Sequence, residues 1–106
     1  MFFEFREYRT RPGQREAWVK YIEQVIIPFQ VSKGMVILGS FVGQQEDDLY
    51  VWIRRFESEA EREKQYNDVY QSDEWKNTIG PLIGDLIDRE RIKVTRLEAT
   101  PKSVIQ

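Results

Sequence analysis

The sequence predicts a single α+β domain of the ferredoxin-like type, βαββαβ, with a four-stranded antiparallel sheet and helices on one face. Three observations predict it. The chain has 106 residues, enough for one domain that spans 1–106, with 98–106 as a C-terminal tail. The apolar pattern changes twice from a period of two residues to a helical period and back. Short turn signals separate the segments.

The first strand is expected over residues 2–10, where apolar and polar side chains alternate. The turn signal Arg-Pro-Gly at 11–13 ends it. From Gln14 onward the apolar residues recur at helical spacing. Because a proline disfavours helical geometry at the preceding residue, Pro28 predicts that this helix ends near Ile27.

The second and third strands are expected over 35–44 and 49–56, joined by an acidic hairpin loop at 46–48. The second strand is apolar on both faces. A strand of that kind is covered on both sides, so a single helical layer does not suffice.

The later helices begin at capping residues. Ser58 and Glu61 have the spacing of a capping box, in which each side chain accepts from a backbone N–H of the other residue. Ser72 or Asp73 begins another helical run, which we expect to kink or to split into two short helices at Gly80-Pro81.

The last strand is expected over 91–98, and it completes the sheet. We expect the helices to cover one sheet face and to leave an aromatic face open. That face would carry Tyr8, Tyr50, Trp52 and Phe56. A second copy packed face to face is the simplest cover, which predicts a homodimer.

Composition excludes several classes of function. The net charge is −2 and the pI is about 5.2, which argues against a general nucleic-acid binder. The chain has no Cys and no His, so thiolate chemistry, Ser-His pairs and proximal-His haem ligation are excluded, and we expect no metal and no cofactor. No signal peptide or membrane span is apparent, which predicts a cytoplasmic protein.

An RNA-binding sheet has the same order of elements, and residues 50–53 carry the alternating aromatic side chains of its third strand. However, Asp48-Leu49 stands where that motif has a basic residue and Gly, and Arg55 stands at its last aromatic position. We therefore expect no nucleic-acid partner.

Charged and aromatic side chains meet on one face of the first and third strands. Arg6 and Arg54 can both approach Glu4 there, in a partly buried layer beside Tyr8 and Trp52. The two arginines could hold a carboxylate or enolate ligand against aromatic walls. Alternatively, Glu4 neutralises one arginine and the set stabilises an interface between copies, the interpretation we favour.

A second cluster is expected between the second helical region and the sheet, where Tyr66, Asn67, Tyr70 and Trp75 come together. Tyrosine hydroxyls there could polarise a substrate carbonyl or supply a base. The simpler interpretation is an aromatic seam that joins helix to sheet.

Three stretches within about residues 2–98 carry distinctive motifs. They are Phe-Phe-Glu-Phe-Arg-x-Tyr-Arg at 2–9 with the turn at 11–13, the strand-to-helix junction at 56–63, and Ser-Asp-Glu-Trp at 72–75. In their order and spacing they resemble the first strand and turn, the strand-to-helix junction and the Asp-x-x-Trp element of the NIPSNAP family. The resemblance implies a dimeric α+β barrel without a settled reaction.

One position departs from that pattern, because many members carry His and Trp where this chain has Trp52 and Arg54. Related barrel families include cofactor-free monooxygenases, polyketide cyclases and haem-degrading enzymes. Activities of those families that need a His do not transfer to this chain.

These observations predict a homodimeric protein that binds a small apolar or anionic molecule, or acts as an interaction module, with no assigned catalysis. The alternative is a cofactor-free monooxygenase or polyketide-cyclase-like enzyme acting on an enolisable aromatic substrate. Whether the protein is an enzyme stays open. The candidate ligand-binding residues are Arg6, Tyr8, Trp52, Arg54, Tyr70 and Trp75.

Overall fold

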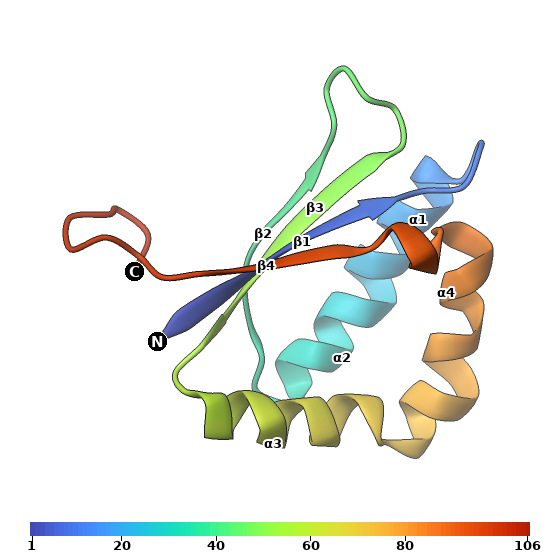
Figure 1. Ribbon diagram of the computed structural model, residues 1–106. Helices are drawn as coiled ribbons and strands as arrows, with labels where there is room; N and C mark the ends of the chain where they lie inside the picture. The colour runs from blue at the N-terminus through green and yellow to red at the C-terminus, as the bar shows by residue number, and fades with distance from the viewer.

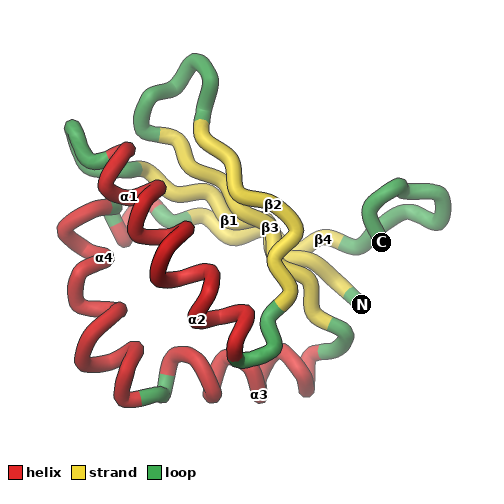
Figure 2. The backbone as a smooth tube through the Cα atoms, turned by 180° about the vertical axis from the view of Figure 1, so that it is seen from behind, coloured by secondary structure: helices red, strands yellow, loops and turns green.

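The computed structural model describes all 106 residues and has one four-stranded antiparallel sheet with every helix on the same side (Figures 1 and 2). The strand order is β2-β3-β1-β4, so β1 and β3 are the central pair. The predicted fold class is confirmed. The strands are β1 (Phe2–Arg9), β2 (Val36–Val42), β3 (Leu49–Phe56) and β4 (Lys93–Leu97).

Two long helical runs and one separate helix form the covering layer (Figure 2). None of these helices is long and apolar enough to cross a bilayer. In chain order the segments are α1 (Arg15–Tyr21), the π-helical η1 (Ile22–Ile26), α2 (Ile27–Ser32), α3 (Glu59–Tyr70), the π-helical η2 (Trp75–Ile79), α4 (Gly80–Leu86) and the 3₁₀ turn η3 (Arg89–Arg91).

Pro28 predicts that the first helical run ends near Ile27, but the run continues to Ser32. Pro28 lies in the first turn of α2, directly after the wide turn of η1, where the N–H of Ile27 donates to the carbonyl of Ile22. A proline lacks the N–H for an α-helical bond and clashes with the carbonyl four residues before it. A π turn changes the local bonding partners and so lets the helix pass the proline.

Pro81 repeats this arrangement after η2, where the N–H of Gly80 donates to the carbonyl of Trp75. The helical run there is continuous from 73 to 86. The predicted irregularity at Gly80-Pro81 is therefore a change from a π turn to an α-helix, with two consecutive short segments that meet at Gly80 within one run.

The helices cover the aromatic face of the sheet, so the prediction that this face stays open is wrong. Tyr8, Tyr50, Trp52 and Phe56 are at most 5% exposed. Both faces of the strands carry apolar residues. The alternation of side chains along a strand assigns each residue to one of two faces, but it does not show which face the helices cover. The larger aromatic side chains bury more area, which favours their face as the core.

The opposite face also carries apolar residues. Phe5, Val51 and Ile53 are half-buried there, and Phe41 at the β2 edge is 54% exposed. No helix lies over this face (Figures 1 and 2).

Serine caps start the later helices. The Ser58 hydroxyl accepts from the N–H of Glu61 at 3.1 Å, but the Glu61 carboxylate accepts from the Gln65 amide at 2.9 Å, so only half of the predicted capping box forms. The Ser72 hydroxyl accepts from the N–H of Trp75 at 3.1 Å, and Ser72 is thus the capping residue of that run.

The C-terminal tail projects beyond the end of the sheet (Figure 1). It turns back on itself where the N–H of Ser103 donates to the carbonyl of Thr100 at 3.0 Å. Arg55 on β3 donates to the carbonyl of Gln106 at 2.9 Å. The tail is therefore attached to the open face of its own sheet.

Candidate functional site

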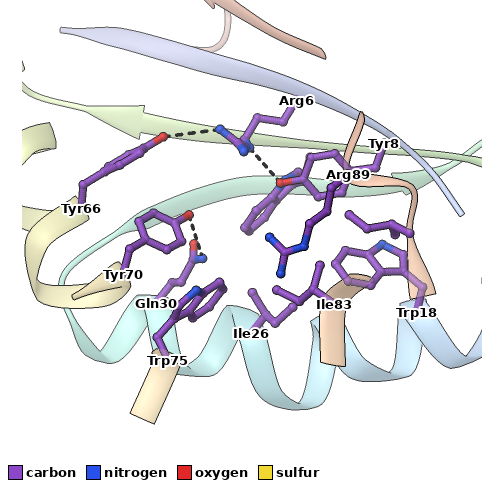
Figure 3. A pocket seen from close by; sticks show the side chains of 12 residues that line it. Arg6, Tyr8, Trp18, Ile26, Gln30, Tyr66, Tyr70, Trp75, Ile83 and Arg89 are labelled. Carbon is purple, nitrogen blue, oxygen red and sulfur yellow. Dashed lines mark hydrogen bonds between the residues drawn. The ribbon is translucent and has the colours of Figure 1, made fainter. Parts of the chain in front are cut away.

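A cavity of about 140 Å³ lies between the aromatic sheet face and the helices (Figure 3). It is enclosed by side chains from β1, β3, both long helical runs, α3 and η3. Ile26, Ile83 and Ile87 supply its aliphatic wall. The sheet and helix layers hold these side chains in place, because the same isoleucines belong to the main hydrophobic core.

Five of the six predicted ligand-binding residues line this cavity: Arg6, Tyr8, Trp52, Tyr70 and Trp75. The antiparallel register explains the convergence on the sheet, since Arg6 lies opposite Trp52 in the central strand pair. The helices bring the other two side chains to the same space (Figure 3).

Arg54, the sixth, lies outside the lining in a fully buried network. Its Nη2 donates to the Glu4 carboxylate and to the Tyr66 hydroxyl, both at 2.7 Å. Its Nη1 donates to the Gln30 side-chain oxygen at 2.9 Å and to the Tyr70 hydroxyl at 2.7 Å. Arg54 therefore positions groups around the cavity without facing it.

The Glu4–Arg54 pair is structural, but it lies within the core of one chain. The favoured interpretation placed it at an interface between copies, and that location is wrong because both residues are 0% exposed beneath the chain's own helices.

Glu4 keeps its negative charge despite this burial. Burial alone would raise the pKa of its carboxyl, but the charge of Arg54 and hydrogen bonds from Arg62, Tyr66 and Arg54 lower that pKa to about 2. Arg62 donates at 2.8 Å and Tyr66 at 2.7 Å to the second carboxylate oxygen. Tyr66 stays protonated, since burial raises its pKa to about 12 although Arg54 opposes the shift.

Arg6 lines the cavity from β1, with its side chain 15% exposed. Its Nε donates to the Tyr8 hydroxyl at 2.9 Å, and its Nη1 donates to the Tyr66 hydroxyl at 3.4 Å (Figure 3). Its Nη1 is also 3.5 Å from the Glu4 carboxylate. These contacts fix the guanidinium at the sheet side of the cavity.

Sequence reasoning missed Arg89, whose guanidinium points into the middle of the cavity from η3 (Figure 3). Its Nη2 donates to the carbonyl of Gly80 at 2.7 Å, and the residue as a whole is exposed, so it stands at the solvent side. No periodic pattern pointed to a residue in this irregular turn. Trp18 lies on the apolar stripe that begins after Gln14, and such spacing predicts only a core position; the residue both packs in the core and lines the cavity.

The predicted aromatic cluster is an aromatic seam. The Tyr66 and Tyr70 rings are 5.0 Å apart, and the Tyr70 and Trp75 rings 4.9 Å apart, both edge to face. Asn67 is exposed and takes no part in it. The three rings of the seam also line the cavity.

This arrangement provides two guanidinium groups beside an aromatic and aliphatic pocket. It does not provide a base-stacking surface, because Tyr50 and Trp52 are 1% and 2% exposed beneath the helices. No group of three or more acidic side chains is placed to hold a metal ion.

Comparison with known proteins finds the NIPSNAP family, whose profile matches residues 3–101. A NIPSNAP family protein of unknown function from Agrobacterium tumefaciens is 25% identical, with a TM-score of 0.89 over 100% of this chain and 94% of that chain. A second Agrobacterium tumefaciens NIPSNAP family protein is 20% identical, with a TM-score of 0.87 over 99% and 98%.

An antibiotic biosynthesis monooxygenase is 16% identical, with a TM-score of 0.67 over 95% of this chain and 100% of that chain, which indicates a shared fold. A comparison with curated proteins finds no match. The profile covers nearly the whole chain, and the motifs at the first strand and at the junction before α3 lie within it. The chain belongs to the NIPSNAP family.

Proposed function

We propose that this protein binds a small apolar or anionic molecule in the cavity between sheet and helices. The cavity itself carries the proposal. At about 140 Å³ it is close to the roughly 150 Å³ of an engineered apolar cavity that binds benzene. Unlike that cavity, it has the cationic side chains of Arg6 and Arg89 at its wall, which can orient a ligand.

A cavity-filling variant tests this proposal. Ile83 lines the cavity and is 6% exposed, whereas Leu82 next to it is 49% exposed. We expect compounds from a library of neutral and anionic single-ring fragments to change the tryptophan fluorescence of the wild type and of Leu82→Phe. We expect Ile83→Phe to abolish the response while its circular dichroism is unchanged. Fragments that act equally on both variants would contradict the proposal.

The alternative function, proton abstraction from an enolisable aromatic substrate, needs a base in the cavity. No carboxylate lines it, and burial holds the pKa of Tyr66 at about 12. These features favour binding over catalysis.

Deuterium exchange separates the two functions. Phenylpyruvate combines a single ring, a carboxylate and an enolisable carbon, and its benzylic hydrogens exchange measurably by NMR. We expect no acceleration of that exchange by the protein. Acceleration that disappears in Tyr70→Phe would favour the enzymatic alternative.

The homodimer remains part of the proposal, now through the other face of the sheet. The half-buried Phe5, Val51 and Ile53 form its apolar centre, and Glu7 and Lys93 provide opposite charges at one side. A two-fold pair of such faces is self-complementary and packs as two sheets about 10 Å apart. We expect a sedimentation-equilibrium mass of about twice the 12.7 kDa of one chain.

A further inference from the structure

Two residues that line the cavity carry hydrogen-bond donors without a partner. The indole N–H groups of Trp18 and Trp52 are buried and unpaired, and the two residues are 1% and 2% exposed. An unpaired buried donor costs folding free energy. A ligand whose acceptor atom reaches either N–H would remove that cost.

Two tyrosine hydroxyls extend this donor set. The Tyr70 oxygen accepts from Arg54 at 2.7 Å and from the Gln30 amide at 3.3 Å, and no acceptor takes its own hydrogen. The Tyr8 oxygen accepts from Arg6 at 2.9 Å, again with its own hydrogen unclaimed. Tyr66 differs, because it donates to Glu4. Since a cation donates to each of their oxygens, Tyr8 and Tyr70 are strengthened as donors.

The charge at the cavity is positive. Arg6 and Arg89 line it, and no Asp or Glu does. The nearest carboxylate, Glu4, lies 3.5 Å from Arg6 but is bound more closely by Arg54 and Arg62, at 2.7 and 2.8 Å. A ligand with acceptors and a negative charge therefore matches the lining, whereas a ligand with donors finds few free acceptors, because the Tyr8 and Tyr70 oxygens already accept from Arg6 and Arg54.

The size of the cavity limits the rest of the ligand to about one ring. Aromatic side chains enclose it on several sides, and Trp75 stands at the opposite end from Trp18 (Figure 3). We infer that the ligand is a single-ring aromatic carboxylate, held at its carboxylate by the cavity's donors with Arg89 at the solvent side. The inference rests on the proposed function and specifies its ligand class.

Benzoate and benzamide test the inference, because they have nearly the same shape and differ in charge and in donor content. All three tryptophans of the chain line the cavity, so tryptophan fluorescence reports directly on occupancy. We expect benzoate to change the fluorescence saturably, with an affinity at least about tenfold higher than that of benzamide.

Arg89→Gln and Arg91→Gln form a matched pair on the same turn, since Arg91 lies outside the cavity and is paired only with Asp48 at 3.7 Å. We expect Arg89→Gln to weaken benzoate about tenfold and to leave benzamide unchanged. We expect Arg91→Gln to bind both compounds as the wild type does. An equal loss of benzoate in both variants, or none in either, would overturn the role of Arg89.

The outcomes separate the ligand class from the proposed function. If benzamide or other neutral rings bind as tightly as benzoate and Ile83→Phe blocks them, the carboxylate assignment is overturned while small-molecule binding stands. If no ring compound, charged or neutral, changes the fluorescence at millimolar concentration, both are overturned.

Discussion

Glu4 and Arg54 form an ion pair that no water reaches, and its stability depends on the groups around it. The pair itself is 2.7 Å long, and both residues are 0% exposed. Buried pairs add little net stability, but the removal of one partner leaves an unpaired charge. The tyrosine hydroxyls of α3 reduce that risk by binding both members.

Glu4→Gln retains the shape of the side chain and removes its charge. We expect it to lower the free energy of unfolding by about 3–5 kcal/mol, because Arg54 then stays charged and buried without its counter-ion. Urea denaturation at pH 7 measures this. Glu63→Gln is the control, since Glu63 is exposed on α3 and forms no ion pair. Equal losses of stability in the two variants would contradict the special role of the buried Glu4 carboxylate.

The same carboxylate predicts a dependence on pH. The pKa of Glu4 is lowered from 4.5 to about 2 in the folded protein. A lowered pKa stabilises the fold above the unfolded-state value, and this stability is lost as the pH falls through the folded-state value. We expect about 3 kcal/mol to disappear between about pH 5 and pH 2. Glu4→Gln should lack this component, and parallel acid profiles of the two proteins would contradict the assignment.

The two clusters predicted from the sequence contain six of the twelve side chains around the cavity, but the sequence did not show which of them face the cavity and which support it. Strand alternation placed Arg6, Tyr8 and Arg54 on one face. The alternation could not show that Tyr66, Tyr70 and Gln30 would form hydrogen bonds with Arg54 from the helical layer. Those contacts depend on how the helices pack on the sheet. Arg89 follows no periodic pattern, and its position at the cavity depends on where η3 lies in the folded chain.

At the scale of elements, the strands followed their sequence patterns closely and the helices did not. The third strand occupies residues 49–56 as predicted, and the first ends one residue early, at Arg9. Pro28 predicts the end of a helix, and Gly80-Pro81 predicts a kink or two consecutive short helices. The sequence has no local motif for the π turns that let both helical runs continue past these prolines.

The π turn at η2 also predicts opposite effects for two glycines of α4. A Cβ at Gly80 would lie 2.9 Å from the carbonyl oxygen of Trp75 and 3.1 Å from its indole nitrogen, whereas a Cβ at Gly84 meets only the Arg89 side chain at 3.6 Å. We expect Gly80→Ala to lower the free energy of unfolding by roughly 1–3 kcal/mol through overpacking.

Gly84→Ala serves as the matched comparison and should raise the free energy of unfolding by roughly 0.5–1 kcal/mol, because alanine loses less backbone entropy in a helix. Urea denaturation of both variants at one protein concentration measures the difference. Similar effects of the two substitutions would show that the close packing of Gly80 on Trp75 is not significant.

At the scale of the whole molecule, the helices cover only one side of the sheet, and the apolar residues of the other side remain open. Apolar patterning on both strand faces predicted that two covers exist. It did not identify which face the helices cover. The helices cover the face that carries Tyr8, Tyr50 and Trp52. The homodimer remains a prediction, and we now expect its interface on the face around Val51.

Val51→Asp places a charge at the centre of that face. We expect it to sediment as a single chain of 12.7 kDa, since an unpaired carboxylate is costly in an apolar interface. The cavity lies within one chain, so the monomer should still bind benzoate. Val31→Asp on α2, where Val31 is 52% exposed, should stay dimeric. Dimers of Val51→Asp would place the interface elsewhere.

A crystal structure of the wild type grown with benzoate would show whether the cavity between sheet and helices holds a ligand. We expect density for one ring there, with the carboxylate within hydrogen-bond distance of Arg89 or Arg6. A cavity filled by rearranged side chains, or benzoate bound only at the outer surface, would contradict this expectation.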